Sequence, residues 1–303
     1  MMYTPVVSDS KYLTITALVD GCTVKLNNTY QYSFDESTWQ SGSSSKTITL
    51  PNGNNLYLKG SLTPVYKSGV GTFTISGYCA LSGNCLSLIY GDNADEAMLV
   101  PDYGFTNLFQ NCAAIKSVSK NFLPAISVGE RGYQNLFNGC SNLENTPDLP
   151  ATTLSNYSYT GIFVGCSSLI SAPELPATKI GNSTYYGMFR NCSSLINVPS
   201  TIPVETITGK DSMMFMFHNC INLIKSPTLP LKELYQTCYQ GMFKGCSSLR
   251  EITMLATDIS ATSCLNDWVG EVAESGTFYK SQDATWNISG NSGVPSGWDI
   301  ITV

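Results

Sequence analysis

The sequence has 303 residues, of which 43% are hydrophobic and 13% charged, with a net charge of −6. This length allows two domains and a sizeable core, and the few charges leave much of the surface to Ser, Thr, Asn and Gly. Lysine and arginine form no basic stripe for nucleic acid, and no apolar stretch approaches the roughly 20 residues that span a bilayer. We therefore expect no nucleic-acid partner and no membrane span.

The first 90 or so residues are predicted to form short strands. Residues 1–10 are expected to be a loosely attached arm. Apolar residues then alternate with polar ones in residues 13–17, 22–26, 30–34, 46–50, 55–59, 71–75 and 85–89. Asp20-Gly21 separates the first two segments and predicts a hairpin between them. Short strands with frequent turn residues predict an antiparallel β-sandwich over residues 1–96.

Two features of this region are candidates for function. Trp39 is expected to fill the core, and the alternative is an exposed ring that stacks on sugar. Residues 91–96, Gly-Asp-Asn-Ala-Asp-Glu, carry three carboxylates, but they lack the ligand order of a calcium loop. We expect a solvated linker here, and we expect neither a metal nor a cofactor.

A repeated unit dominates the rest of the chain. Phe and Cys recur three residues apart in six units, whose cysteines are Cys112, Cys140, Cys166, Cys192, Cys220 and Cys246. Successive cysteines are 26 or 28 residues apart. A near-constant period of this size is typical of a solenoid, in which each unit buries its apolar face only against its neighbours. We place the solenoid at residues 97–260.

The columns of the repeat predict the inside of each coil. The Phe, the Cys, the residue three after the Cys and the aromatic four before the Phe are expected to face the core. The spacing Tyr-x-x-Met-Phe predicts a short helix that ends at the Asn or Gly two residues after the Phe. An extended segment follows, which predicts a parallel ladder across the coils. Its strands should be very short, because proline recurs at Pro147, Pro173, Pro199 and Pro227.

The repeat resembles a known family. Phe163-Val-Gly-Cys-Ser-Ser-Leu169 and Phe243-Lys-Gly-Cys-Ser-Ser-Leu249, with looser versions across about residues 103–260, resemble the bacterial leucine-rich repeats of the BspA-like type. The resemblance implies a leucine-rich-repeat solenoid and a role in adhesion or protein binding at the cell surface. It carries over no catalytic residue. The proline column and the 28-residue units depart from the family pattern.

The last segment, residues 261–303, is expected to cap the solenoid, because the final coil would otherwise expose its core face. A capped helix is predicted over residues 260–270, with strands over residues 276–280 and 297–303. Trp268, Trp286 and Trp298 are expected to pack beneath this cap. The expected fold class is therefore α+β: a β-sandwich, a solenoid with a short helix and a short parallel strand in each coil, and a C-terminal cap.

The 11 cysteines are expected to be reduced and structural. Six of them share one repeat column, and free cysteine is among the most buried residue types. Side chains that point in parallel into a core have the wrong geometry for a disulfide. Cys79 and Cys85 flank a short loop and are the one pair that could close, although free thiols fit them equally well.

Few residues could carry catalysis. His218 is the only histidine, and its column is so variable that we expect an exposed, unconstrained position; the other members are Gln110, Asn138, Val164, Arg190 and Lys244. This argues against Ser-His and Cys-His nucleophiles and against multi-histidine metal sites. Asp148 and Glu174, one coil apart, could form a glycosidase-like pair. The matching places in the next coils hold Ser200 and Thr228, so we expect no catalytic residues.

The remaining candidate for function is an extended surface. Stacked coils present columns of variable residues on one face, and such faces bind large partners. We name the predicted binding residues the polar strip; they are Asn145, Asp148, Ser171, Glu174, Asn197, Ser200, Lys225, Thr228 and Glu251. The alternative is a merely solvated face.

The function expected from the sequence is non-catalytic binding or adhesion to a host or bacterial surface protein or glycan. The alternative is a phage or prophage tail-associated receptor-binding protein, and a third hypothesis is a carbohydrate-active enzyme. Composition favours a cell-surface or extracellular location. The first residues lack the basic start and apolar core of a signal peptide, so either a leader has been removed or export takes another route.

Overall fold

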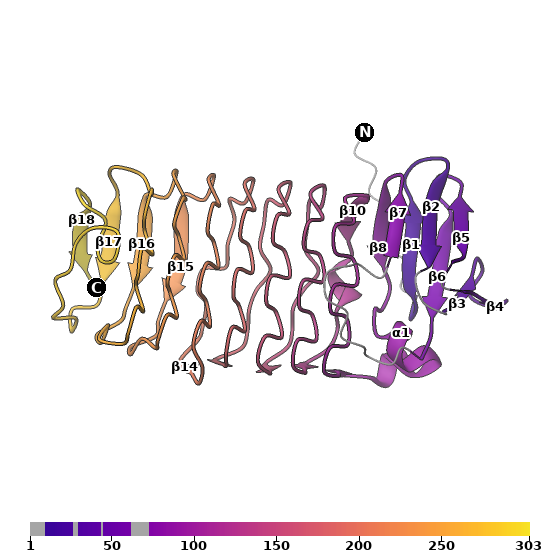
Figure 1. The fold of residues 1–303 in the computed structure, drawn as a ribbon, viewed down its shortest axis with the longest axis horizontal. Helices are drawn as coiled ribbons and strands as arrows, with labels where there is room; N and C mark the ends of the chain where they lie inside the picture. Colours follow the sequence, from indigo (N-terminus) through magenta and orange to yellow (C-terminus); the bar gives the residue numbers. More distant parts are fainter. Residues whose placement is uncertain (1–9, 27–29, 44, 62–72) are drawn as a thin grey trace.

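The computed structural model describes residues 10–26, 30–43, 45–61 and 73–303. In these ranges the protein consists mostly of short strands and turns, with few helices, and most of the chain winds into a solenoid. The body is elongated, with the N-terminal strands at one end and the C-terminus at the other (Figure 1). The arm predicted at residues 1–10 lies outside the described residues except for Ser10.

Two sheets make up the N-terminal region. Its strands are β1 (Leu13–Ala17), β2 (Cys22–Leu26), β3 (Gln31–Ser33), β4 (Gln40–Ser41), β5 (Thr47–Leu50), β6 (Asn55–Lys59), β7 (Phe73–Ser76) and β8 (Cys79–Ser82). Together with β10 (Ile115–Val118), these strands form sheets of order β10-β8-β1-β6-β3-β4 and β5-β2-β7. The apolar residues of both sheets belong to one continuous core.

The predicted hairpin between the first two strands is wrong, because β1 and β2 lie in different sheets. β1 pairs with β6 and β8, whereas β2 pairs with β5 and β7. Gly21 does reverse the chain, with φ at 72°. An Asp-Gly pair signals such a reversal without determining which strands pair. β2 alternates buried and less buried residues, and β1 buries four of its five residues, so both sheets can turn an apolar side to the shared core.

The strand predicted over residues 85–89 is also wrong, because helical turns occupy this region. They are α1 (Ser87–Tyr90) and the 3-10 helix η1 (Gly91–Glu96). The Asn84 side chain accepts a hydrogen bond from the Leu86 amide (2.9 Å) and so closes a local turn. The Ser87 hydroxyl accepts from the Leu13 amide and donates to the Leu58 carbonyl, which ties the helix to β1 and β6.

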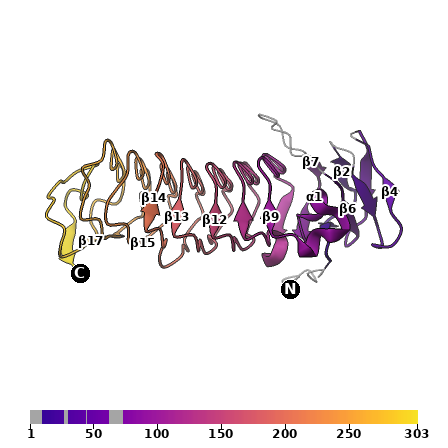
Figure 2. The same ribbon diagram turned by 90° about the horizontal axis from the view of Figure 1, so that it is seen from below.

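Each coil of the solenoid has three sides. We call them the turn run, which ends near the column cysteine; the long ladder, which follows it; and the short ladder, which leads to the next coil (Figures 1 and 2). Long-ladder strands are β10, β15 (Lys225–Leu229), β16 (Glu251–Met254), β17 (Thr277–Lys280) and β18 (Asp299–Thr302), and the 3-10 helix η2 (Lys120–Phe122) follows β10. Short-ladder strands are β9 (Leu99–Val100), β11 (Ser127–Val128), β12 (Thr153–Leu154), β13 (Lys179–Ile180) and β14 (Thr206–Ile207).

The long ladder is parallel, as predicted, and its strands are interrupted at the proline column; the short ladder, which was not predicted, is also parallel. The pairs β15–β16, β16–β17 and β17–β18 are parallel. At Pro173 and Pro199, which are buried, the coils are joined by isolated bridges such as Ser171 to Asn197. At Pro227 the register between β15 and β16 shifts. Proline has no amide proton for a central strand to use, which explains the short strands.

The helix predicted in each coil is wrong, because a series of turns takes its place. In the coil of Phe163, φ is positive at Tyr157, Gly161 and Gly165, with values of 59°, 62° and 70°. The same three places are left-handed in the other coils of the repeat. A left-handed residue every four positions is incompatible with an α-helix.

Backbone hydrogen bonds of the turn run alternate between two kinds of partner. The Phe163 amide donates to the Met188 carbonyl in the next coil (3.0 Å). The amide before it, that of Ile162, donates to the Tyr159 carbonyl three residues back (3.3 Å). Half of these amides therefore join neighbouring coils, so the turn run links the stack as the ladders do.

The Phe and Cys columns face inward, as predicted. The Phe163 ring is fully buried and stacks between Phe137, at a centroid distance of 5.8 Å, and Phe189, at 5.6 Å. Tyr159 stacks in the same way between the tyrosines of its neighbouring coils, at 5.8 and 6.0 Å. Each ring covers the next, so the core runs along the solenoid without interruption.

All eleven cysteines are free and buried, including Cys79 and Cys85. The Cys192 thiol donates to the Phe163 carbonyl of the preceding coil (3.1 Å). The same contact, 3.0 to 3.2 Å long, recurs for every column cysteine. Burial raises the pKa of Cys192 to about 12, so this thiol is protonated and unreactive at neutral pH. The column thus supplies both small apolar groups and a hydrogen bond between coils.

The N-terminal strands close one end of the solenoid. β10 of the first coil pairs in parallel with β8, and the Cys79 amide donates to the Ala114 carbonyl (2.9 Å). The Phe73 ring stacks on Phe109 at 5.2 Å and on Tyr30 at 5.5 Å, so the aromatic stack extends into the N-terminal strands. One core cluster crosses the predicted boundaries at 96/97 and 260/261, so these boundaries do not separate independent cores.

The other end repeats the turn run with Trp268 at the position of the Met that precedes the Phe in other coils, and with Val269 at the position of the Phe. The Phe243 amide donates to the Trp268 carbonyl (2.8 Å), and Trp268 is fully buried. Trp298 is also buried, whereas Trp286 is half-buried. The helix predicted over residues 260–270 is wrong, because this segment forms the same turns as the other coils. The two predicted C-terminal strands are present as β17 and β18.

Candidate binding surface

The long ladder aligns members of the polar strip across neighbouring coils. Ser171 and Asn197 form a parallel bridge, and the Asn197 amide group donates to the Ser171 hydroxyl (3.0 Å). Lys225 and Glu251 are register partners in β15 and β16 and form an ion pair. These residues of the predicted strip therefore lie side by side in the long ladder, and their polar groups bind one another.

The first coils use strip residues in a similar way. The Asn145 side chain donates to the Val118 carbonyl (2.6 Å) and accepts from the Val118 amide (3.3 Å), so it substitutes for a strand partner of β10. Asp148 pairs with Lys120 of the preceding coil at 3.3 Å, with both side chains more than half exposed.

The remaining strip residues are more simply exposed. Glu174 and Ser200 are exposed, and Thr228 is half-buried beside its bridge partner Thr201. Asp148 is bound by Lys120 on the side away from Glu174, since Lys120 precedes it by one coil and Glu174 follows it by one coil. This arrangement gives no geometric support to the glycosidase-like pair.

Sequence reasoning missed a column of exposed isoleucines beside the polar strip. Ile170, Ile196 and Ile224 occupy the position four residues after the column cysteine in three successive coils, and they are 48%, 48% and 54% exposed. We call these three residues the isoleucine column. The signal was present in the sequence, because each of them follows the inward-facing leucine of its coil.

Charged residues flank the isoleucine column at the same position of the coil. Lys116 and Glu144 precede it and form an ion pair at 3.2 Å, in which the Glu144 side chain is 59% exposed. Arg250 follows the column and is exposed. Among the residues that the structure describes, Arg250 belongs to none of the recorded ion pairs.

Backbone hydrogen bonds hold these side chains in line. The Ile196 amide donates to the Ile170 carbonyl (3.0 Å), and the Arg250 amide donates to the Ile224 carbonyl (2.9 Å). The Glu144 amide donates in the same way to the Lys116 carbonyl of the preceding coil (3.0 Å). We call the polar strip and the isoleucine column together, with the flanking Lys116, Glu144 and Arg250, the ladder face. It is a rigid surface, because its side chains project from a backbone that is paired between coils.

A polar hollow lies on a different side of the coils. β12 pairs with β11 and β13 pairs with β14, but the described short ladder is interrupted between β12 and β13. There the Gly181 amide donates to the Thr184 hydroxyl (3.0 Å) instead of to β12. A hollow of 440 Å³ opens at the interruption, lined by Thr152, Thr153, Leu154, Ser155, Asn156, Lys179, Ile180, Gly181 and Thr208.

The position of His218 differs from the expectation. This residue and the others of its column are half-buried, because each lies against the same column in the coils beside it. The His218 ring meets the Phe215 ring edge-on at 5.5 Å. The Arg190 guanidinium lies 5.5 Å from the centroid of the Phe215 ring. Burial, with Arg190 and Lys244 nearby, lowers the pKa of His218. The imidazole is therefore neutral at pH 7.

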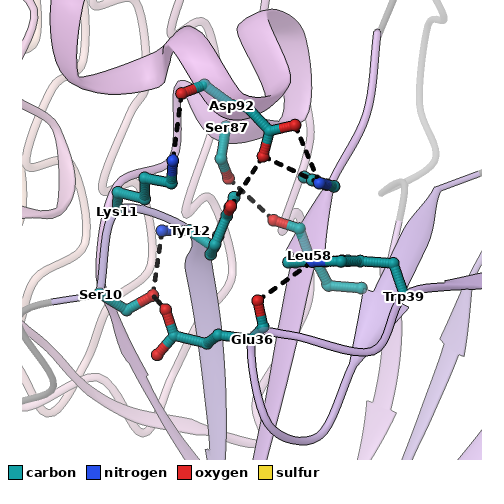
Figure 3. Close-up of polar contacts among 9 residues, drawn as sticks. Ser10, Lys11, Tyr12, Glu36, Trp39, Leu58, Ser87 and Asp92 are labelled. Carbon is teal, nitrogen blue, oxygen red and sulfur yellow. Dashed lines mark hydrogen bonds and ion pairs between the residues drawn. The ribbon is translucent and has the colours of Figure 1, made fainter.

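The predicted linker is part of a polar cluster at the N-terminal sheets (Figure 3). Asp92 of η1 binds the Lys59 ammonium at 2.8 Å and accepts a hydrogen bond from the Tyr12 hydroxyl (2.7 Å). These two contacts lower the pKa of Asp92. The carboxylate thus fixes η1 to β1 and β6, so the segment is more than a solvated linker.

Trp39 belongs to the same cluster and is neither a core residue nor an exposed platform (Figure 3). It is half-buried: Tyr12 meets its ring edge-on at 4.6 Å, and the Lys59 ammonium lies 4.2 Å from the ring centroid. An open hollow of 380 Å³ lies near the cluster, with Lys59 and Asp92 in its lining. Lys59 therefore covers the ring that could have stacked on sugar.

Comparisons with protein-family models, with curated proteins and with solved structures give no match to this chain. In the described ranges the structure contains no helix of the length and apolar character that crossing a membrane requires. The same ranges hold no group of three or more His, Cys, Asp or Glu side chains arranged for a metal ion.

Proposed function

We propose that this protein is a non-catalytic binding protein that uses its ladder face to hold a protein or glycan partner at a cell surface. The observation that supports this most is the isoleucine column. Three aligned side chains, each about half exposed, place apolar surface where a solenoid could carry polar residues at no structural cost. Contiguous exposed apolar surface with a polar rim is typical of interaction sites.

The mechanism of binding follows from the rigidity of the face. Because backbone hydrogen bonds join neighbouring coils in the turn run and in both ladders, the ladder face loses little conformational entropy when a partner binds. The isoleucines would supply apolar contact, and the polar strip would supply hydrogen bonds and charges around them. Binding through many modest contacts suits a large partner better than a small molecule.

We also infer a BspA-like leucine-rich-repeat architecture and a sandwich of the two N-terminal sheets. The repeat motif and the inward Leu column support the first inference, and the shared core of the two sheets supports the second. The series of turns in place of a helix is a departure from the expected coil. A surface location agrees with a face built from Ser, Asn and Ile side chains.

The experiment measures binding to a panel of extracellular proteins and glycans with matched variants. Ile196→Asp places a charge in the centre of the ladder face. Ile126→Asp is the control, because Ile126 is equally exposed at 51% but its carbonyl accepts from Thr152 and Thr153 in the short ladder. We expect Ile196→Asp to abolish binding and Ile126→Asp to leave it unchanged. Equal loss in both variants, or no binding to any panel component with the protein itself included in the panel, would contradict the proposal.

A further inference from the structure

The order of residues along the isoleucine column is self-complementary. From coil to coil this position holds Glu144, Ile170, Ile196, Ile224 and Arg250. Counted from Ile196, an isoleucine stands one coil away on both sides. Two coils away, a carboxylate stands on one side and a guanidinium on the other.

We propose that the partner of the ladder face is a second copy of this chain, docked antiparallel about a two-fold axis through Ile196. This inference rests on the proposed use of the ladder face for binding. A two-fold axis along the strand direction makes each column face itself in reversed coil order. Ile196 then meets its own copy, and Ile170 meets Ile224 of the other chain.

The charges select this orientation over the parallel one. In the antiparallel arrangement Glu144 of each chain faces Arg250 of the other, which gives two favourable pairs. In a parallel arrangement Glu144 would face Glu144 and Arg250 would face Arg250, and like charges across an interface are strongly unfavourable. The Lys116–Glu144 pair leaves the Glu144 side chain 59% exposed, so this carboxylate can also accept Arg250 of a second chain.

The polar strip is compatible with the same arrangement. Reversal about the coil of Ile196 places Asn145 opposite Glu251 and Ser171 opposite Lys225, while Asn197 faces its own copy. Among these facing positions no two like charges meet. The acidic residue Glu174 faces the segment of Pro227 and Thr228, which carries no charge.

The shape of the solenoid permits the contact. Figure 1 shows the coils stacked along a nearly straight axis, so the columns of two antiparallel copies can remain in register over several coils. The apolar centre is small, only three isoleucines from each chain, so we expect a weak dimer that depends on concentration and salt.

The test is sedimentation equilibrium of the full chain over a range of concentrations. We expect the wild-type protein to pass from monomer to dimer as concentration rises. Glu144→Arg alone and Arg250→Glu alone should each raise the dissociation constant by about tenfold or more, because each puts like charges at both ends of the column. Ile196→Asp should do the same, and Ile126→Asp should not.

The decisive sample is an equal mixture of the two charge variants. In the mixture the arginine introduced by Glu144→Arg in one chain meets the glutamate introduced by Arg250→Glu in the other. The native pair forms at the opposite end, so dimers should return, and recovery on mixing cannot come from misfolded single variants. A monomeric wild type at every concentration, or charge variants that associate alone as the wild type does, would overturn the inference. A monomeric chain that still binds a panel ligand through Ile196 would leave the proposed function standing.

Discussion

The aromatic stack makes Phe163→Ala the sharpest test of the core. Phe163 is fully buried and has a parallel ring on each side, tilted by 2° from Phe137 and by 10° from Phe189. Replacing a buried Phe by Ala removes apolar contact and leaves a cavity, at a cost of about 3–5 kcal/mol. Two ring contacts are lost at once, each worth about 0.5–1.5 kcal/mol beyond burial. We therefore expect a loss of about 4–5 kcal/mol.

The assay is guanidinium unfolding followed by circular dichroism, with the free energy taken from the midpoint and slope. The control is Val164→Ala in the same coil, where the side chain is half-buried and outside the stack. It should lose about 0.5–1.5 kcal/mol. A Phe163→Ala variant that is no less stable than Val164→Ala would refute the inward stacking of the Phe column.

Three further predictions concern the turn run, the thiols and the N-terminal cluster. Gly241→Ala should destabilise the protein by about 1–2 kcal/mol more than Gly187→Ala. Both glycines are left-handed, but a Cβ at Gly241 would lie 2.3 Å from the Phe215 ring, whereas the nearest atom at Gly187 is 3.8 Å away; equal melting temperatures would contradict this packing. Burial raises the pKa of Cys246 to about 12 and of Cys112 to about 11. In the unfolded chain a thiol ionises from about pH 8.5, whereas the buried thiols of the folded protein keep their protons at that pH. Unfolding therefore releases protons in this range. As pH rises from about 8.5 to 12, the free energy of unfolding should fall by about 1.4 kcal/mol per thiol and pH unit. Unfolding midpoints that stay constant from pH 8 to about pH 10 would exclude the effect. Asp92→Asn breaks the pair with Lys59 and should cost at most about 1 kcal/mol, because the Asp92 side chain is 60% exposed. Since the pKa of Asp92 is lowered in the folded state, this contribution is present above the unfolded pKa of about 4 and disappears as pH falls below it, which a pH series of the wild type and the variant can measure.

The inside of the solenoid could be predicted from the sequence because burial constrains it. Residues that repeat in every coil, such as Phe163 and Cys166, must meet their own kind in the next coil, so a fixed period is enough to place them in the core. The prolines predicted the short strands for a comparable reason, since the missing amide proton acts at the residue itself.

The turn run could not be identified from apolar spacing alone. A Tyr-x-x-Met-Phe spacing suits one face of a helix, and it also suits the observed series of turns, in which Tyr159, Ile162 and Phe163 are all buried. The second column of Asn and Gly, two residues before the Phe, distinguishes the series of turns from the helix. Gly161 and Asn135 lie inside the expected helix, where both residues are unfavourable, and both have positive φ in the structure.

Strand partners and surface columns were harder to predict for different reasons. Which sheet β2 joins depends on contacts with β5 and β7, and the local turn before it carries no information about them. The isoleucine column was visible as exposed positions following inward leucines, but an apolar residue suggests the core unless the register is known. The half-buried state of His218 depends on side chains of adjacent coils, which the variability of its own column conceals.

The central claim is that the coils stack in register, with the repeat columns facing one shared core. Counting reactive thiols tests this claim most directly. All eleven cysteines are buried and free in the structure. With a thiol reagent at neutral pH, the native protein should show no fast-reacting thiol, and the unfolded protein should show all eleven. Rapid reaction of the column cysteines in the native protein, or fewer than eleven thiols after unfolding without reductant, would contradict the account.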